Sequence, residues 1–214
     1  MSGRTVWIVD AAYLMKASPG RIDYLLLRNA LEERLKRTFA EAYYVDSAPS
    51  PPTEQQESYY TWLKSAPPRG PKMRVRLHRL KGLQVECPGC HVRFERNVQQ
   101  GVDVAIATLI VKLAAQNQYD TLLLSAGDGD FEDAVQYVKE ELHKEVWLAG
   151  FEGKVSADLQ SYADEMIWLN ELWPRIRKAV PAPVGGGTIL SFPMNVIRPQ
   201  APEEAPPSGG KPSA

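Results

Sequence analysis

Four aspartates in three separate segments are the residues of this sequence best suited to chemistry: Asp10, Asp103, Asp128 and Asp130. The first follows the apolar run of residues 5–9, and the last two follow the run of residues 121–125 through a glycine-containing turn. Gathered carboxylates repel one another, so such a cluster is suited to hold a cation. Oxygen ligands favour Mg²⁺ or Mn²⁺ over zinc. A divalent ion polarises a phosphodiester and lowers the pKa of a bound water, so the implied chemistry is hydrolysis.

Each aspartate also has an ordinary structural explanation. Asp10 can simply end a strand, and Asp103 can be favoured near a helix start by the helix dipole. Asp128 and Asp130 can serve as turn and N-cap residues. The sequence alone leaves the structural and the metal-binding interpretations both open. Only three histidines occur, and no Ser-His-Asp or Cys-His arrangement competes with the aspartates.

The elements that must position these aspartates alternate along the chain. Continuous apolar runs predict buried strands, and amphipathic stretches between them predict helices. We expect strands over residues 5–9, 41–46, 73–79, 121–125, 145–149 and 166–169. We expect helices over residues 24–39, 54–65, 98–117, 130–142, 155–162 and 171–179. This order predicts a three-layer, Rossmann-like α/β/α domain with a mostly parallel sheet, whose carboxyl edge carries the aspartates.

Composition divides the chain near residue 180. The 214 residues are 44% hydrophobic and 24% charged with a net charge of −1, as in a globular domain without a general attraction for polyanions. Residues 1–180 are expected to form the domain. Residues 181–214 hold eight of the 17 prolines and are expected to be a disordered tail. Within it, the apolar residues 188–197 could bind the domain or a protein partner.

Cysteine use and hydropathy indicate a reducing compartment. Two cysteines are too few for a disulfide framework, and neither a signal peptide nor a membrane span is visible in the sequence. We therefore expect a cytoplasmic protein that does not contact membranes.

A Cys-Pro-Gly-Cys turn interrupts the domain between two alternating segments. Cys87 and Cys90 lie in a predicted β-hairpin insertion over about residues 83–96. The turn resembles one knuckle of a zinc ribbon, but Zn²⁺ normally needs four ligands, and only His91, His78 or a second copy of the chain could add to two cysteines. Two free thiols are the simpler interpretation, and a zinc site is the weaker one.

A basic strip follows the predicted strand of residues 73–79 into the hairpin. Such a strip can track a phosphate backbone, and it can equally be a charged edge strand that prevents aggregation. The candidate RNA-binding residues are Arg74, Arg76, Arg79, Lys81, Arg93 and Arg96.

Four stretches of the sequence resemble the NYN domain of the PIN-like nuclease superfamily, with the LabA-like (DUF88) group most similar. They are VWIVDAAYL at residues 6–14, NVQQGVDVAIATLIVKLA at 97–114, YDTLLLSAGDGDFEDAVQYV at 119–138 and KEVWLAGF at 144–151. The resemblance implies a PIN-like fold and an Mg²⁺- or Mn²⁺-dependent endoribonuclease that cleaves RNA. Matching positions would make Asp10, Asp103, Asp128 and Asp130 the metal-binding and catalytic site, with Ser125 and Tyr13 in support.

The sequence departs from the family pattern at three places. Tyr13 stands where the family usually has Asn, Gln100 where it has Lys, and Thr108 and Leu109 where a further Asp often occurs. The alternative function is therefore a non-catalytic module that binds RNA or a protein, and a DNA nuclease is a third option. We place the active ribonuclease first because all four core aspartates are present. PIN-like domains often dimerise, so a homodimer is a further expectation by analogy.

Overall fold

The structure is a computed structural model that describes residues 3–86, 88–98 and 101–179. Within the hairpin, the side chains of residues 81–83, 85 and 94–98 are outside the description. The predicted tail, Cys87 and Gln100 also lie outside the described residues. Residues Met1–Ala179 form one compact unit, which contains all the elements described below.

A six-stranded sheet forms the centre of this unit, with all neighbouring strands parallel. The strand order is β3-β2-β1-β6-β7-β8. Strand β1 therefore lies between β2, the next strand in the chain, and β6, which comes much later. The strands are β1 (Thr5–Asp10), β2 (Phe39–Ala48), β3 (Arg74–Arg79), β6 (Thr121–Ser125), β7 (Glu145–Gly150) and β8 (Glu165–Trp168). The prediction of an α/β domain is confirmed, and the main sheet is wholly parallel.

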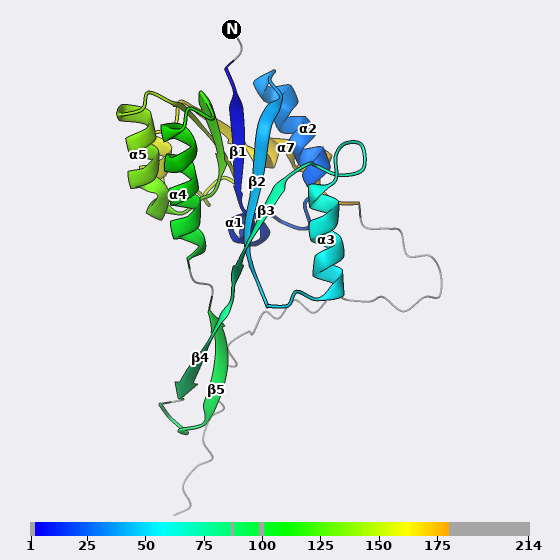
Figure 1. Ribbon diagram of the computed structural model, residues 1–214, viewed down its shortest axis with the longest axis vertical. Coiled ribbons are helices and arrows are strands. Elements are labelled where there is room, and N and C mark those ends of the chain that lie inside the picture. Colours follow the sequence, from blue (N-terminus) through cyan, green and yellow to red (C-terminus); the bar gives the residue numbers. More distant parts are fainter. Residues whose placement is uncertain (1–2, 87, 99–100, 180–214) are drawn as a thin grey trace, which may run out of the picture. The chain divides into compact units, whose positions relative to one another are not determined.

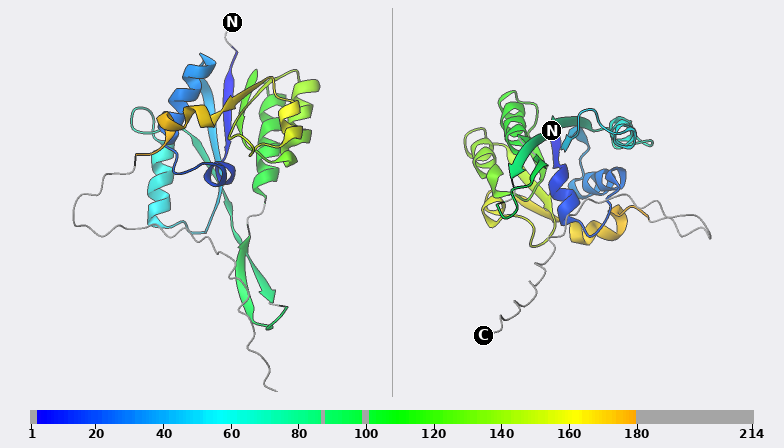
Figure 2. Two further views of the ribbon diagram at one scale, coloured as in Figure 1. Left: turned by 180° about the vertical axis from the view of Figure 1, so that it is seen from behind. Right: turned by 90° about the horizontal axis from the view of Figure 1, so that it is seen from below.

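Helices cover both faces of this sheet, as Figures 1 and 2 show. One layer holds α4 (Val102–Ala115), α5 (Glu132–Glu140) and α6 (Ala157–Ser161). The other holds α1 (Ala11–Ala17), α2 (Tyr24–Leu35), α3 (Glu54–Lys64) and α7 (Leu169–Ile176). Side chains of β1 alternate between the two cores: Val6 and Ile8 pack toward α4, and Trp7 and Val9 pack toward α2.

Several element boundaries differ from the sequence prediction. Helix α1 was not predicted, because it has only seven residues and follows β1 without a loop. Helix α2 ends at Leu35, where Lys36 takes a left-handed conformation with φ of 54°. The predicted helix over residues 98–117 begins only at Val102, after Gly101 with φ of 82°. Val98 instead belongs to the preceding strand.

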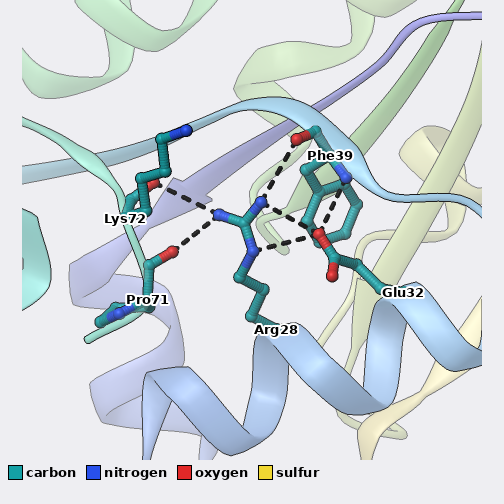
Figure 3. A network of polar contacts seen from close by, with 5 residues as sticks. All are labelled: Arg28, Glu32, Phe39, Pro71 and Lys72. Atoms are coloured by element: carbon teal, nitrogen blue, oxygen red, sulfur yellow. Dashed lines mark hydrogen bonds and ion pairs between the residues drawn. The ribbon is translucent and has the colours of Figure 1, made fainter. Parts of the chain in front are cut away.

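A buried arginine joins three parts of the α2 layer, shown in Figure 3. The Arg28 guanidinium donates hydrogen bonds to the backbone carbonyls of Pro71 (2.7 Å) and Phe39 (3.2 Å). It also pairs with Glu32 one helical turn later, at 3.0 Å, and Glu32 accepts a hydrogen bond from the Phe39 N–H. Arg28 therefore connects α2 to the start of β2 and to the loop before β3.

The predicted hairpin is present and is longer than expected. Strands β4 (Lys81–Glu86) and β5 (Arg93–Val98) pair antiparallel with each other in a sheet of their own. Only Leu80 separates β4 from the end of β3, and β5 ends four residues before α4 begins. The hairpin thus follows the end of β3 and precedes α4, in the lower part of Figure 1.

Candidate active site

An open pocket lies at the carboxyl edge of the sheet. Its volume is about 680 Å³, and segments from four parts of the chain line it. The acidic lining residues are Asp10, Asp103 and Asp128, and the basic ones are Lys16 and Lys154. The remaining lining residues are Ala12, Tyr13, Ala17, Gly127, Gly129 and Ser156. The structure thus brings three of the four predicted aspartates to one pocket, as expected for the ends of parallel strands.

Asp10 is the most buried of these carboxylates, with 6% of its surface exposed. It is the last residue of β1 and also the N-cap of α1, where its side chain accepts a hydrogen bond from the Tyr13 N–H at 3.1 Å. Burial raises the pKa of the Asp10 carboxyl, and the negative charge of Asp103 raises it further. The two carboxylates therefore interact electrostatically although they lie 93 positions apart in the chain.

Asp128 and Asp130 differ in their positions. Asp128 caps the short helix η1 (Gly129–Phe131), and its Oδ1 accepts a hydrogen bond from the Asp130 N–H at 3.2 Å. Asp128 is exposed and lines the pocket. The Asp130 side chain is exposed and does not line the pocket. Capping and pocket lining are thus combined in Asp10 and in Asp128, so the structural and functional interpretations of these residues are compatible.

The donor chemistry of the pocket suits a hard divalent cation. Asp10, Asp103 and Asp128 form no ion pair with Lys or Arg among the described residues. Within that same part of the chain, no three acidic, His or Cys side chains already lie close enough together to bind one metal ion. Mg²⁺ commonly binds through one or two carboxylates and keeps several waters. The residues present therefore fit an ion held by few protein ligands.

Tyr13 forms one wall of the pocket and fills the space that two glycines leave. A Cβ at position 127 would lie 2.2 Å from the Tyr13 ring, and a Cβ at position 150 would lie 2.6 Å from its hydroxyl. The hydroxyl oxygen accepts a hydrogen bond from the Phe151 N–H at 3.0 Å. Burial raises the pKa of Tyr13, so the phenol stays neutral. Tyr13 thus connects α1 to the end of β7.

Two lysines of the pocket were missed by sequence reasoning. Lys16 lies in the last turn of α1, and Lys154 lies in the loop between β7 and α6. Both are exposed, and neither forms an ion pair within the described ranges. No local motif marks either lysine, because only the tertiary fold brings them together.

Asp46 is a further buried carboxylate near the site that the sequence analysis treated only as a strand residue. It is 8% exposed and accepts a hydrogen bond from the Ser47 N–H at 2.8 Å. Its Oδ2 also lies within 3.4 Å of the Tyr60 hydroxyl and 3.5 Å of the Tyr44 hydroxyl. Burial raises the pKa of Asp46 to about 6. It does not line the pocket.

The predicted basic strip is present on β3, an edge strand of the sheet. Arg76 pairs across the strands with Val45, and Val45 pairs with Asp10, so Arg76 and Asp10 share one row of the sheet. Because two strand spacings separate the residues, the Cα atoms of Arg76 and Asp10 lie roughly 10 Å apart. The Arg76 guanidinium lies over the Tyr43 ring and has no acidic partner in the described chain, whereas Arg74 forms an ion pair with Glu41.

The other candidate residues lie apart from the pocket. Arg79 is exposed at the end of β3, and Arg93 pairs with Glu86 within the hairpin at 3.2 Å. The side chains of Lys81 and Arg96 lie outside the description. Ser125 is fully buried and accepts a hydrogen bond from the Trp7 indole at 2.9 Å, so it supports the β1–β6 contact.

The hairpin turn offers one described cysteine. Cys90 is exposed with a free thiol, and His91 contacts Glu86 at 2.9 Å. Among the described residues, therefore, the zinc interpretation gains no group of ligands.

A parallel α/β sheet with an acidic pocket at its carboxyl edge places this protein among the three-layer α/β proteins that bind ligands at that edge. The chain belongs to the NYN domain family, whose profile matches residues 4–170. NYN domains form a PIN-like nuclease family whose members are typically ribonucleases that use divalent cations.

A solved structure shares this fold. A protein of unknown function from Vibrio parahaemolyticus RIMD 2210633 superposes with a TM-score of 0.57 at 19% sequence identity, covering 78% of this chain and 93% of that one. MurG of Acinetobacter baumannii gives a TM-score of only 0.38 at 12% identity over 76% of this chain and 40% of its own, and supports no conclusion. No curated protein matches the sequence. No helix in the described part of the chain is long and apolar enough to cross a membrane.

Proposed function

We propose that this protein is a metal-dependent endoribonuclease that hydrolyses RNA phosphodiester bonds in the pocket at the carboxyl edge of the sheet. The observation that carries the proposal is the convergence of Asp10, Asp103 and Asp128, from three separate segments, on one open pocket. Membership of the NYN family supports the choice of a nucleic acid as substrate.

Asp10, Asp103 and Asp128 would hold Mg²⁺ or Mn²⁺. The chemistry that such a cation supplies is stabilisation of charge on the phosphodiester and a lower pKa for a bound water. Asp10 is fixed by its buried backbone and by the hydrogen bond from the Tyr13 N–H, so it is pre-oriented. Asp103 and Asp128 are exposed and can adjust to the ligand or accept a proton. The reaction needs no covalent intermediate on the enzyme.

Asp130 would act through Asp128 rather than by direct contact. Its backbone N–H holds Asp128 Oδ1, while its own carboxylate faces solvent beside the pocket. A substrate that covers this rim could bring the Asp130 side chain into use.

The RNA would approach along β3. Arg76 lies in the same sheet row as Asp10 and is free of acidic partners among the described residues, so it can bind a phosphate next to the pocket. Arg79 continues the strip toward the hairpin, where Lys81, Arg93 and Arg96 follow in the sequence. The basic strip thus offers a route for a single strand that ends at the carboxylates.

A cleavage assay tests the proposal. Labelled single-stranded RNA and DNA of one sequence are incubated with the full chain in Mn²⁺, Mg²⁺ or EDTA. We expect metal-dependent cleavage of RNA. Asp103→Asn and Asp128→Asn should each reduce it by at least about 100-fold, because each variant loses a negative charge that attracts the divalent cation. Asp133→Asn, an exposed aspartate of α5 outside the pocket, is the matched control and should cleave normally.

A second candidate function is RNA binding without cleavage. It is favoured by the Tyr13 ring, which fills part of the pocket, and by the absence, among the described residues, of three ligand side chains close enough to share one metal ion. RNA retained by the wild-type protein without product in any metal would support this second candidate and contradict the nuclease. Cleavage that Asp128→Asn leaves unchanged would remove the pocket from the mechanism.

A further inference from the structure

The two pocket lysines place positive charge beside the carboxylates, and the Lys16 charge is close enough to Asp10 to act on it. Lys16 and Lys154 line the same open pocket as three aspartates, yet the described residues contain no ion pair between the two sets. Opposite charges that share a pocket without pairing remain available to ligands of both signs. An anion that approaches the carboxylates meets their repulsion, and nearby ammonium groups offset it.

The backbone that carries Lys154 is firmly held, although the side chain is exposed. The Lys154 N–H donates to the Phe151 carbonyl at 3.0 Å, and the Ser156 N–H donates to the Gly127 carbonyl at 2.9 Å. The Lys154 carbonyl packs so closely on Gly127 that a Cβ there would lie 2.2 Å from it. The loop between β7 and α6 is thus fixed against the turn that presents Asp128.

Tyr13 joins this loop to the segment that carries the other lysine. Its hydroxyl accepts the Phe151 N–H at the start of the loop, and Lys16 follows Tyr13 by about one turn of α1. The two lysines therefore come from segments that are hydrogen-bonded to each other through one side chain. This arrangement fixes the backbone segments that carry both lysines relative to each other.

The position of Lys154 places it opposite the basic strip of β3. In the sheet order β3-β2-β1-β6-β7-β8, β3 lies two strands to one side of Asp10 and β7 lies two strands to the other. Arg76 and Lys154 thus stand on opposite sides of the carboxylates. A strand that contacts both must continue past the pocket in both directions, as an internal cleavage site requires.

We propose that Lys16 and Lys154 form a phosphate-binding subsite that holds a phosphodiester of the substrate beside the carboxylates of the pocket. This subsite rests on the proposed function for the identity of its polyanion, and it makes the enzyme's grip on RNA two-sided. The recognised chemistry is the phosphodiester itself, which RNA and DNA share.

Binding measured without cleavage tests the subsite. Fluorescence anisotropy follows a labelled single-stranded RNA on the full chain in EDTA across a series of salt concentrations. The double variant Lys16→Gln/Lys154→Gln should bind more weakly, and its slope of log affinity against log salt should be shallower by about 1.4, since each phosphate contact on a single strand contributes about 0.7. Lys16→Arg/Lys154→Arg should restore the wild-type slope because it restores both charges.

The matched control is Lys64→Gln/Lys112→Gln. These exposed lysines lie in the last turns of α3 and α4 and outside the pocket, so the change in net charge is identical. The control should keep the wild-type slope. If both double variants change the slope equally, net charge explains the effect, and the subsite is wrong. A single-stranded DNA of the same sequence should show the same lysine dependence, and an effect confined to RNA would point to the 2′-hydroxyl and overturn the phosphate assignment.

Failure of the subsite and failure of the nuclease can be told apart. Lysine-independent binding together with metal-dependent cleavage overturns the subsite and leaves the nuclease. Lysine-dependent binding without cleavage in any metal supports the subsite and overturns the nuclease. A wild-type protein that binds no RNA in EDTA and cleaves none in any metal overturns both.

Discussion

At the scale of single residues, the carboxylates near the site differ because their surroundings differ. Asp10 and Asp46 end up buried at the carboxyl ends of neighbouring strands, while Asp103, Asp128 and Asp130 remain exposed. Burial disfavours the charged form, so the buried pair holds its protons more tightly than exposed carboxyls do. Burial is the main reason that the pKa values of Tyr24 and Tyr60 are raised, and the negative charge of Asp46 raises both further.

The raised pKa of Asp46 predicts a specific dependence of stability on pH. The folded protein releases this proton near pH 6, whereas the unfolded chain releases it at the ordinary value of 3.8. The stabilisation is thus complete below about pH 4 and is lost as the pH rises through 6, at a cost of about 3 kcal/mol. Asp46→Asn removes this titration, so its free energy of unfolding should exceed that of the wild type by up to about 3 kcal/mol at pH 7.5.

Urea unfolding at pH 4.5 and at pH 7.5 measures this difference. The advantage of Asp46→Asn should shrink at pH 4.5, where the wild-type carboxyl is largely protonated. Asp158→Asn, an exposed aspartate of α6, is the control and should give the same small difference at both pH values. An Asp46→Asn variant that is equally destabilised at both pH values would contradict the proposed titration.

The sequence was sufficient for residues whose roles depend on local pattern. The aspartates stood out because apolar strands and glycine turns precede them. Lys16, Lys154 and Asp46 did not, since their partners lie far away in the chain and no spacing rule connects them. The role of Tyr13 could not be predicted either. Only the fold shows that its side chain occupies the space that a Cβ at position 127 or 150 would need.

At the scale of elements, strands were predicted better than helix ends. The runs of residues 5–9 and 121–125 are apolar throughout because helices cover both faces of each strand. Helix α1 gave no comparable signal, since a seven-residue helix defined by its Asp10 cap has no long periodic pattern. The hairpin was recognised from its alternation, although its strands begin and end two residues beyond the predicted limits.

The Arg28 network predicts that one buried cation stabilises the contacts among α2, β2 and the loop before β3. Arg28→Met keeps a side chain of similar length but leaves Glu32 and the carbonyls of Phe39 and Pro71 without this donor. The free energy of unfolding should fall by about 3 kcal/mol, because loss of one member of a buried ion pair leaves the other charge without a partner. Chemical denaturation measures this loss.

Arg34→Met on the same helix is the matched control. Its ion pair with Glu165 spans 3.8 Å between side chains that are each about half exposed, so the loss should stay below about 1 kcal/mol. Equal losses in the two variants would mean that burial of Arg28 adds nothing to its contacts.

At the scale of the whole molecule, the net charge is small, and the positive charge that could bind RNA is local. The net charge of −1 gives no general attraction for RNA, so binding depends on the basic strip of β3 and on the pocket lysines. Every described candidate residue, acidic or basic, belongs to the unit Met1–Ala179. The unit that folds and the unit proposed to act on RNA are therefore the same.

A chain that ends at residue 179 should accordingly keep its fold and its metal-dependent cleavage. We expect its melting temperature to match that of the full chain, because both hydrophobic cores lie within residues 1–179. Thermal unfolding and the RNA cleavage assay, run side by side on both chains, measure the two properties. A shortened chain that melts normally but no longer cleaves would assign part of the activity to residues 180–214.

The central position of β1 has a consequence for how the protein is made. Thr5 pairs with Thr121, which leaves the ribosome later than Thr5 by on the order of ten seconds at ordinary rates of translation. Asp128 and Lys154 follow later still. A nascent chain thus carries Asp10 without the rest of the pocket until most of the domain has been translated. For the proposed ribonuclease, the messenger RNA that encodes it is read almost to the end of this domain before a cleavage site exists beside it.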